Sequence, residues 1–154
     1  MKDMAQELKE IVRTAGIHLS KINERDSGAN SSELEWSKKE ILGHLIDSAA
    51  NNHQRIVRAV YQAADQFPTY DQDRWVEVQC YDGASWDALV GLWVAYNNHL
   101  SHIIENIPAE AESSPCNIGN GKTEPLNLVV KDYLRHLRHH LGGILDRQGI
   151  ASGA

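Results

Sequence analysis

Apolar residues recur at helical spacing in four long segments of the chain, and this periodicity constrains the fold more than any other feature. Stripes of this kind mark residues 3–24, 37–65, 85–107 and 126–147, and no useful length of chain alternates with period two. In the first segment the stripe consists of Met4, Leu8, Ile11, Ala15, Leu19 and Ile22. Because each amphipathic segment must bury one face against the others, the pattern predicts an all-α fold, most simply a four-helix bundle.

Two of these helices carry start signals in the sequence. Ser37 and Glu40 have the spacing of a capping box, in which the serine accepts from the helix backbone and the glutamate reaches back. Trp36 precedes the box and can pack against Ile41. Ser85 stands at the N-cap position of the third helix. These signals predict starts near residues 37 and 85.

The segments between the predicted helices are long. Residues 25–35 are polar and are interpreted as a loop, and residues 67–84 and 108–125 are interpreted as two long connecting loops. Neighbouring antiparallel helices need only about 2–8 connecting residues. The two longer loops are therefore expected to cross the end of the bundle or to cover a site, with Trp75 and Tyr81 either roofing that site or plugging the bundle end.

Length and charge exclude several classes of function. The 154 residues fit a single domain, residues 1–154, and their net charge of −6 argues against a nucleic-acid or anionic-membrane partner. No apolar run approaches the roughly 18 residues of a membrane span, and the N-terminal segment lacks the apolar core of a signal peptide. Cys80 and Cys116, both in predicted loops, are therefore expected to be reduced thiols in a cytoplasmic protein.

Eight histidines are the unusual feature of the composition. His136 and His140 stand four residues apart on the last predicted helix, at one edge of its apolar stripe, whereas His139 points away. Two imidazoles in this relation can share one divalent metal, but they can equally be a pair hydrogen-bonded to neighbouring helices. A metal site would need a third ligand from another helix, with His18, His44, His53, His99 and His102 as the candidates.

The second predicted helix carries two of these candidates on different faces. His53 lies within its apolar stripe, which favours a core residue, and His44 lies on the opposite face. That opposite face also carries Asp47, Asn51 and Arg55, and between residues 41 and 54 the only formal charge is Asp47. A solvated face would normally carry Lys and Glu. The stripe is therefore interpreted as the wall of a polar cleft, with simple exposure as the alternative.

Three stretches resemble the DinB-like family of metalloenzymes, also called YfiT-like: Trp36–Asp47, Trp93–Leu100 and Asp132–Ile144. The resemblance covers about residues 5–147 and implies a four-helix bundle with crossover connections. It also implies a metal triad formed by His44, His136 and His140. Members often have Gly-Gln after the last histidine, where this chain has Gly142-Gly143.

The resemblance further implies an activity. Three histidines suit Zn²⁺ or Ni²⁺ and leave an open position, so the ion would activate a low-molecular-weight thiol or a water. The expected function is a metal-dependent thiol S-transferase or hydrolase acting on a small-molecule substrate, in a homodimer. Asp47 is expected to orient a ligand ring, and Asn51 and Arg55 to contact a polar or anionic group, with ordinary helix–loop hydrogen bonding as the alternative for all three. The alternatives are a non-catalytic metal- or ligand-binding bundle and a purely structural one.

Overall fold

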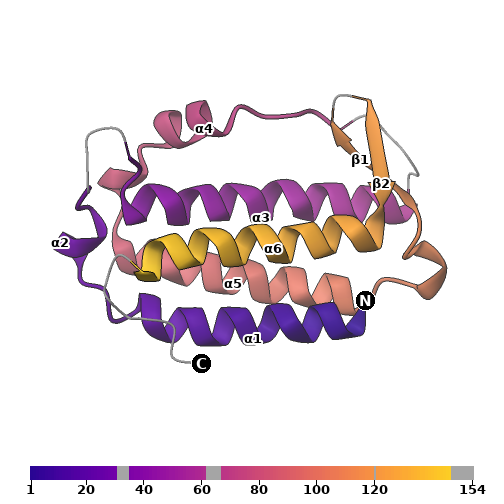
Figure 1. Cartoon of the computed structure of the whole chain (residues 1–154), viewed down its shortest axis with the longest axis horizontal. Helices are drawn as coiled ribbons and strands as arrows, with labels where there is room; N and C mark the ends of the chain where they lie inside the picture. The colour runs from indigo at the N-terminus through magenta and orange to yellow at the C-terminus, as the bar shows by residue number, and fades with distance from the viewer. Residues whose placement is uncertain (31–34, 62–66, 120, 147–154) are drawn as a thin grey trace.

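Four long helices lie side by side in the computed structural model of the chain, which describes residues 1–30, 35–61, 67–119 and 121–146 (Figure 1). They are α1 (Lys2–Leu19), α3 (Lys38–Tyr61), α5 (Trp86–Glu105) and α6 (Leu126–Asp146). The predicted four-helix bundle is confirmed. The predicted ends of the second helix at residue 65 and of the fourth at residue 147 fall outside the described residues.

The first helix is shorter than the periodicity predicts. It ends at Leu19, and a second, one-turn helix, α2 (Glu24–Ser27), begins where a loop was expected. Asn23 caps it, because the Asn23 side chain accepts from Asp26 N at 2.9 Å. Ile22 is buried although it lies outside both helices, which explains why the apolar pattern continues beyond the end of α1.

The order of helices around the bundle explains the long connection between α3 and α5. Helix α1 packs against α5 and α6, and α3 packs against the same two helices, so α1 and α3 lie at opposite corners. Helices α3 and α5 run in the same direction, whereas α1 and α6 run in the opposite one (Figure 1). A chain that joins two parallel neighbours must return along the whole bundle, and a 24-residue helix is about 36 Å long.

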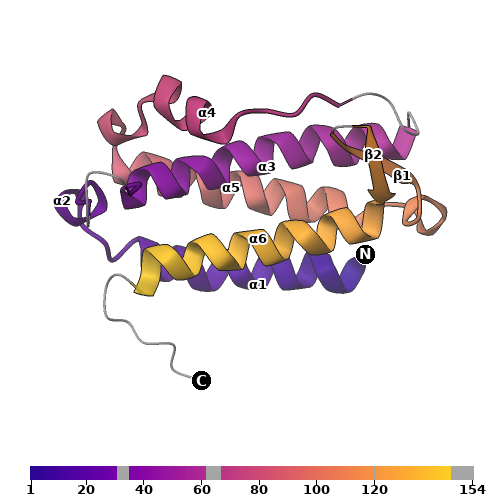
Figure 2. The ribbon, with the colours of Figure 1, turned by 45° about the horizontal axis from the view of Figure 1, so that its top comes forward.

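The returning segment is not the plain loop that was expected over residues 67–84. It contains α4 (Gln72–Gln79) and a 3₁₀ turn, η1 (Tyr81–Gly83), and both pack on the side of α3 that faces away from the bundle (Figures 1 and 2). Asp71 caps α4 by accepting from Arg74 N at 3.2 Å. Cys80 ends the helix in the left-handed conformation, at a φ of 51°. Helix α3 is consequently covered on two opposite faces.

The other long connection, residues 108–125, also contains structure that the sequence pattern did not predict. A 3₁₀ turn, η2 (Ala109–Ala111), precedes an antiparallel hairpin of β1 (Pro115–Gly119) and β2 (Lys122–Pro125). The hairpin packs against α3 and α6 at the end of the bundle where α3 finishes and α6 starts (Figure 2). Gly119 has a φ of +99°, and an added Cβ there would lie 2.2 Å from Thr69 Cγ2, so the hairpin closely contacts the returning segment.

The core lies between the inward faces of the four long helices. Every residue of the predicted stripe on α6 is buried: Leu126, Val130, Tyr133, Leu137, Leu141 and Ile144. On α3 the apolar pattern also includes Val57 and Val60, but both are exposed, and His53, expected in the core, is only half-buried. The stripe prediction is therefore wrong at the C-terminal end of this helix. No helix within the described residues is long and apolar enough to span a membrane.

The two cysteines differ in their surroundings. Both are free thiols, Cys80 exposed and Cys116 buried. Cys116 belongs to β1 rather than to a loop. Burial raises the pKa of the Cys116 thiol to about 11, so this thiol is protonated at neutral pH.

Candidate metal site

The start of α3 is fixed by the capping box that the sequence predicts. Ser37 Oγ accepts from Glu40 N at 3.2 Å, and Glu40 Oε2 accepts from Ser37 N at 2.7 Å. The buried Lys39 ammonium adds hydrogen bonds to the carbonyls of Asp82 and Ala84, on the turn that follows α4. His44 lies one turn further along α3. Because the start of the helix is fixed, the position of the His44 side chain along the bundle axis is fixed as well.

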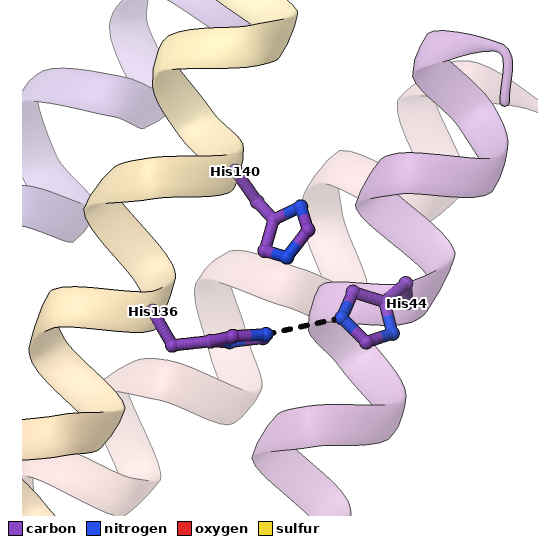
Figure 3. A group of neighbouring side chains, drawn as sticks. All are labelled: His44, His136 and His140. Atoms are coloured by element: carbon purple, nitrogen blue, oxygen red, sulfur yellow. Dashed lines mark hydrogen bonds between the residues drawn. The ribbon is translucent and has the colours of Figure 1, made fainter. Parts of the chain in front are cut away.

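Three histidines from two helices converge at this level. His44 projects from α3 toward His136 and His140, which project from α6 (Figure 3). One ring nitrogen from each lies within 4.8 Å of the others, and His44 Nε2 and His136 Nε2 are 3.2 Å apart. Among the described residues this is the one group of three or more such donors close enough for a metal ion. Helical spacing accounts for the pair on α6, because residues four apart share a face.

The spacing of the two Nε2 atoms fits a shared ion. Two imidazole nitrogens bound to one tetrahedral zinc at 2.0–2.1 Å lie about 3.3 Å apart. The observed 3.2 Å is close to this value. Three nitrogen donors are also the chemistry that borderline divalent ions such as zinc and nickel prefer. The residues present therefore fit a divalent transition metal.

The electrostatics of the site favour the neutral imidazoles that metal binding requires. Burial, followed by the proximity of His136 and His140, lowers the pKa of His44 to about 4. Burial and the neighbouring histidines likewise lower the pKa of His140 to about 4, and burial lowers that of His136. At pH 7 all three rings are uncharged, so protons do not compete with a metal cation for the ring nitrogens.

The polar stripe of α3 lines a cavity rather than facing solvent. His44, Asp47, Ser48 and Asn51 are all buried, because α4 and η1 cover this side of the helix. Two of the three histidines line a cavity of about 600 Å³, whose lining includes His44, Ser48, Asn51, Arg55, Tyr70 and His136. Of the two interpretations of this stripe, cleft lining is confirmed for His44, Ser48, Asn51 and Arg55. Asp47 does not line the cavity, but it is buried, so simple exposure is wrong for it too.

Asp47 is held by residues of the returning segment. Its Oδ1 accepts from Tyr81 Oη at 2.6 Å and from Gln79 Nε2 at 2.8 Å. Its Oδ2 is buried and has no hydrogen-bond partner among the described residues, and the same is true of His44 Nδ1. Burial raises the pKa of the Asp47 carboxyl, against the effect of these hydrogen bonds. Asn51 Nδ2 donates to the Asp47 carbonyl at 2.9 Å.

The aromatic residues around the site take different positions. Trp36 lies over His44, with ring centroids 5.2 Å apart. Tyr81 is buried against Gly43, where an added Cβ would lie 2.1 Å from the Tyr81 ring. Trp75, by contrast, is 40% exposed and packs on Tyr70. Of the two predicted roof residues, Tyr81 therefore reaches the polar face of α3.

The remaining histidines lie outside this cluster. His99, His102 and His139 are exposed, as expected for His102 and His139. His53 contacts His99 and lies 3.2 Å from Tyr96 Oη, so it belongs to a partly solvated contact between α3 and α5. His18 is half-buried on α1.

Sequence reasoning missed Gln79 and Tyr70. Gln79 is the last residue of α4, a helix that no periodic pattern predicts, and it donates to Asp47. Tyr70 lines the cavity from the same returning segment. The available signal was the concentration of aromatic residues between residues 67 and 84, which marks an ordered segment but assigns no partners.

Comparison with solved structures places this arrangement among known folds. YfiT from Bacillus subtilis superposes with a TM-score of 0.84 at 17% sequence identity, covering 96% of this chain and 87% of that one. The chain has the DinB/YfiT-like fold. The resemblance noted in the sequence is thus confirmed at the level of architecture. YfiT itself is described as "a probable metal-dependent hydrolase with an unusual four-helix bundle topology".

The chain also matches part of the mycothiol-dependent maleylpyruvate isomerase. Its TM-score is 0.70 at 16% identity, and a histidine-to-alanine variant of that enzyme matches with the same TM-score at 15% identity. The match covers 89% of this chain but only 59% of the isomerase. No family model and no curated protein sequence matches the chain significantly. The structural likeness therefore establishes the fold.

Proposed function

We propose that the chain is a metal-dependent enzyme in which His44, His136 and His140 bind one divalent transition ion, Zn²⁺ or Ni²⁺. The observation that carries this proposal is the convergence of three imidazoles, 3.2 Å apart at the closest pair, beside a cavity of about 600 Å³ that His44 and His136 line. Three protein ligands are typical of catalytic rather than structural sites, because they leave a coordination position open. The cavity has a size suited to a small-molecule substrate.

We assign Asp47 a positioning role beside this site. Asp47 and His44 lie one turn apart on α3, and each keeps one buried polar atom without a partner among the described residues, Oδ2 and Nδ1. A histidine that binds metal through Nε2 carries its proton on Nδ1 and commonly donates it to a carboxylate or a water. Asp47 Oδ2 would accept that proton directly or through a water, while Tyr81 and Gln79 hold the other oxygen. Asn51 would contact polar groups of a substrate within the cavity.

Two reaction classes suit this site. An ion on three imidazoles lowers the pKa of a water or thiol that binds its open position, which supports either hydrolysis or thiol-dependent group transfer. The likeness to YfiT, a probable metal-dependent hydrolase, favours hydrolysis. The mycothiol dependence of the isomerase favours a low-molecular-weight thiol cosubstrate. We put the thiol S-transferase first, because a cavity extending along α3 from His44 to Arg55 leaves room for a second molecule beside the substrate.

An activity screen tests the proposal. Metal-loaded protein is offered several low-molecular-weight thiols with electrophilic acceptors in one set, and activated esters and amides in another. We expect thiol consumption that requires the acceptor, the metal and His140. The matched pair is His140→Ala against His139→Ala, which removes an exposed neighbour outside the triad. Retention of the full rate in His140→Ala would contradict a catalytic role for the triad.

The same screen addresses the alternative of a non-catalytic binding module. A protein that binds one ion through the three histidines, yet turns over no thiol, ester or amide, would be such a module. The homodimer and the cytoplasmic location stay predictions, which gel filtration with light scattering and cell fractionation test.

A further inference from the structure

Arg55 stands in the cavity three turns along α3 from His44. Both residues line the same space, together with Asn51, Tyr70 and Gln72. Eleven residues at 1.5 Å per residue place the two backbone positions about 16 Å apart. The cavity thus extends from two histidines of the triad, His44 and His136, to the guanidinium group of Arg55.

The charge of Arg55 has no protein counter-ion among the described residues. None of the ion pairs there involves Arg55, and its buried Nε has no hydrogen-bond acceptor. Its guanidinium carbon lies 5.0 Å from the centre of the Phe67 ring, which supports one face of the group. Burial lowers the pKa of Arg55, but an arginine stays charged at neutral pH. A half-buried, unpaired cation of this kind is costly unless a ligand pairs with it.

The acidic residues of the lining do not neutralise Arg55. Asp132 is exposed and ion-paired with Arg135 on its own helix. Glu124 is exposed on β2, and no ion pair joins it to Arg55 within the described chain. The neighbouring groups are neutral hydrogen-bonding side chains: Asn51 and Tyr70, the latter protonated because burial and Asp47 raise its pKa. The surroundings of Arg55 therefore suit a bound anion.

We propose that Arg55 anchors the anionic end of an elongated substrate or cosubstrate whose other end reaches the histidine triad. The ligand class is a chain of several bonds that ends in a carboxylate or a phosphate, since either group accepts from the guanidinium fork. A one- or two-carbon acid is too short to reach both ends of the cavity. The proposal rests on the metal-dependent function for the triad end of the ligand, but the anion subsite itself does not require metal.

The first experiment tests the subsite alone. Calorimetry measures the binding of hexanoate, hexyl phosphate and neutral hexanol to the full chain in EDTA. We expect both anions to bind more tightly than hexanol, and Arg55→Gln to lose about tenfold or more of the anion affinity. Comparison of the two anions tells whether the subsite prefers a carboxylate or a phosphate. Arg58→Gln is the matched control, because Arg58 is on the same helix but does not line the cavity.

A second variant separates the effect of Arg55 on anion binding from the effect of its contact with Phe67 on the structure. Arg55→Lys retains a cation beside Phe67 and is expected to keep part of the anion affinity. Circular dichroism confirms that each variant is folded. Equal anion binding by wild type and a folded Arg55→Gln would overturn the proposal, and so would an equal loss in Arg58→Gln, which would indicate general charge attraction.

The second experiment tests the reach of the ligand. Zinc-loaded protein is titrated with ω-mercaptocarboxylates of two to ten methylene groups and with ω-mercaptoalcohols of equal length. The carboxylate should bind more tightly than the alcohol only above a minimum length, and only when Arg55 is present. If the anions bind through Arg55 in EDTA but no thiol binds the zinc-loaded protein, the proposed thiol-transfer function fails and the anion subsite stands. If the carboxylate bound more tightly than the alcohol at every length, the proposal that one ligand spans from Arg55 to the histidine triad would be overturned.

Discussion

His44 Nε2 and His136 Nε2 lie 3.2 Å apart across the contact between α3 and α6, although 92 residues separate them along the chain. His140 completes the group from the next turn of α6. Because the two helices bring these rings together only when the bundle is formed, the site belongs to the folded state. Any ion that it binds must therefore stabilise the fold.

Zinc is predicted to raise the melting temperature. A ligand present at 100 times its dissociation constant stabilises the native state by about 2.7 kcal/mol, which for about 150 residues corresponds to roughly 5–10 °C. The shift should appear in wild type and in His139→Ala and be lost in His136→Ala. Differential scanning calorimetry measures it. An undiminished shift in His136→Ala would place the bound zinc elsewhere.

The stability of the metal-free protein is predicted to fall as the pH drops from about 6.5 toward about 4. The folded pKa of His44 and of His140 is about 4, below the value near 6.5 of an unfolded chain. Within this window the unfolded chain binds more protons, so the free energy of unfolding decreases with falling pH. Urea unfolding in EDTA at a series of pH values measures this dependence. His44→Gln should flatten the dependence and the exposed His139→Gln should not; equal slopes would contradict the buried, neutral state of His44.

Gly43→Ala is predicted to destabilise the protein by about 1–3 kcal/mol, the usual cost of overpacking. The new methyl group would lie 2.1 Å from the Tyr81 ring, so the ring and its hydrogen bond to Asp47 must shift. Gly91→Ala is the matched control on α5, because no atom lies within 4 Å of the Cβ added there. That change should be neutral or stabilise by about 0.4–1 kcal/mol. Chemical denaturation that ranks the two variants in the opposite order would refute the packing of Tyr81 on α3.

Tyr81→Phe is predicted to cost about 1–3 kcal/mol, because Asp47 Oδ1 loses one of its two donors in a buried setting. The loss also raises the pKa of Asp47 further, since the Tyr81 hydrogen bond helps to hold it down. Urea denaturation measures the first effect and NMR titration of the carboxyl group the second. Tyr61→Phe, at an exposed position, should change stability by less than about 0.5 kcal/mol. Equal costs for the two variants would argue against the Tyr81–Asp47 contact.

The four long helices could be predicted because their apolar faces repeat with the helical period and are buried together. The stripe on α6 is buried in full, and the capping residues Ser37 and Ser85 act as their positions indicate. The end of α1 was misplaced because Ile22 continues the apolar pattern without continuing the helix. Periodicity reports burial, and burial extends into ordered turns.

The connections could not be predicted in the same way. Helix α4 has eight residues and one buried side chain, Val76, so it carries almost no periodic signal. The strands β1 and β2 span five and four residues, and β2 is exposed throughout, which leaves no alternation to detect. These elements owe their structure to contact with α3 and α6, which is tertiary information.

The candidate site was predictable in part. The i, i+4 spacing indicates His136 and His140, but the third residue of the group lies on another helix and spacing alone leaves five candidates. The resemblance selected His44, and the structure places His44 beside the pair. The low charge of the face with Asp47 and Asn51 indicated a covered cleft, whereas Gln79 and Tyr81 became its partners only through the path of the returning segment.

Metal stoichiometry tests the central claim most directly. Untagged protein is incubated with Zn²⁺ or Ni²⁺, dialysed, and analysed by inductively coupled plasma mass spectrometry, alongside alanine variants at His44, His136 and His140 and the control His139→Ala. A single three-histidine site predicts about one equivalent in wild type and in the control, and less than about 0.1 equivalent in each triad variant. Less than about 0.1 equivalent in wild type, or equal loading in the triad variants, would contradict the account.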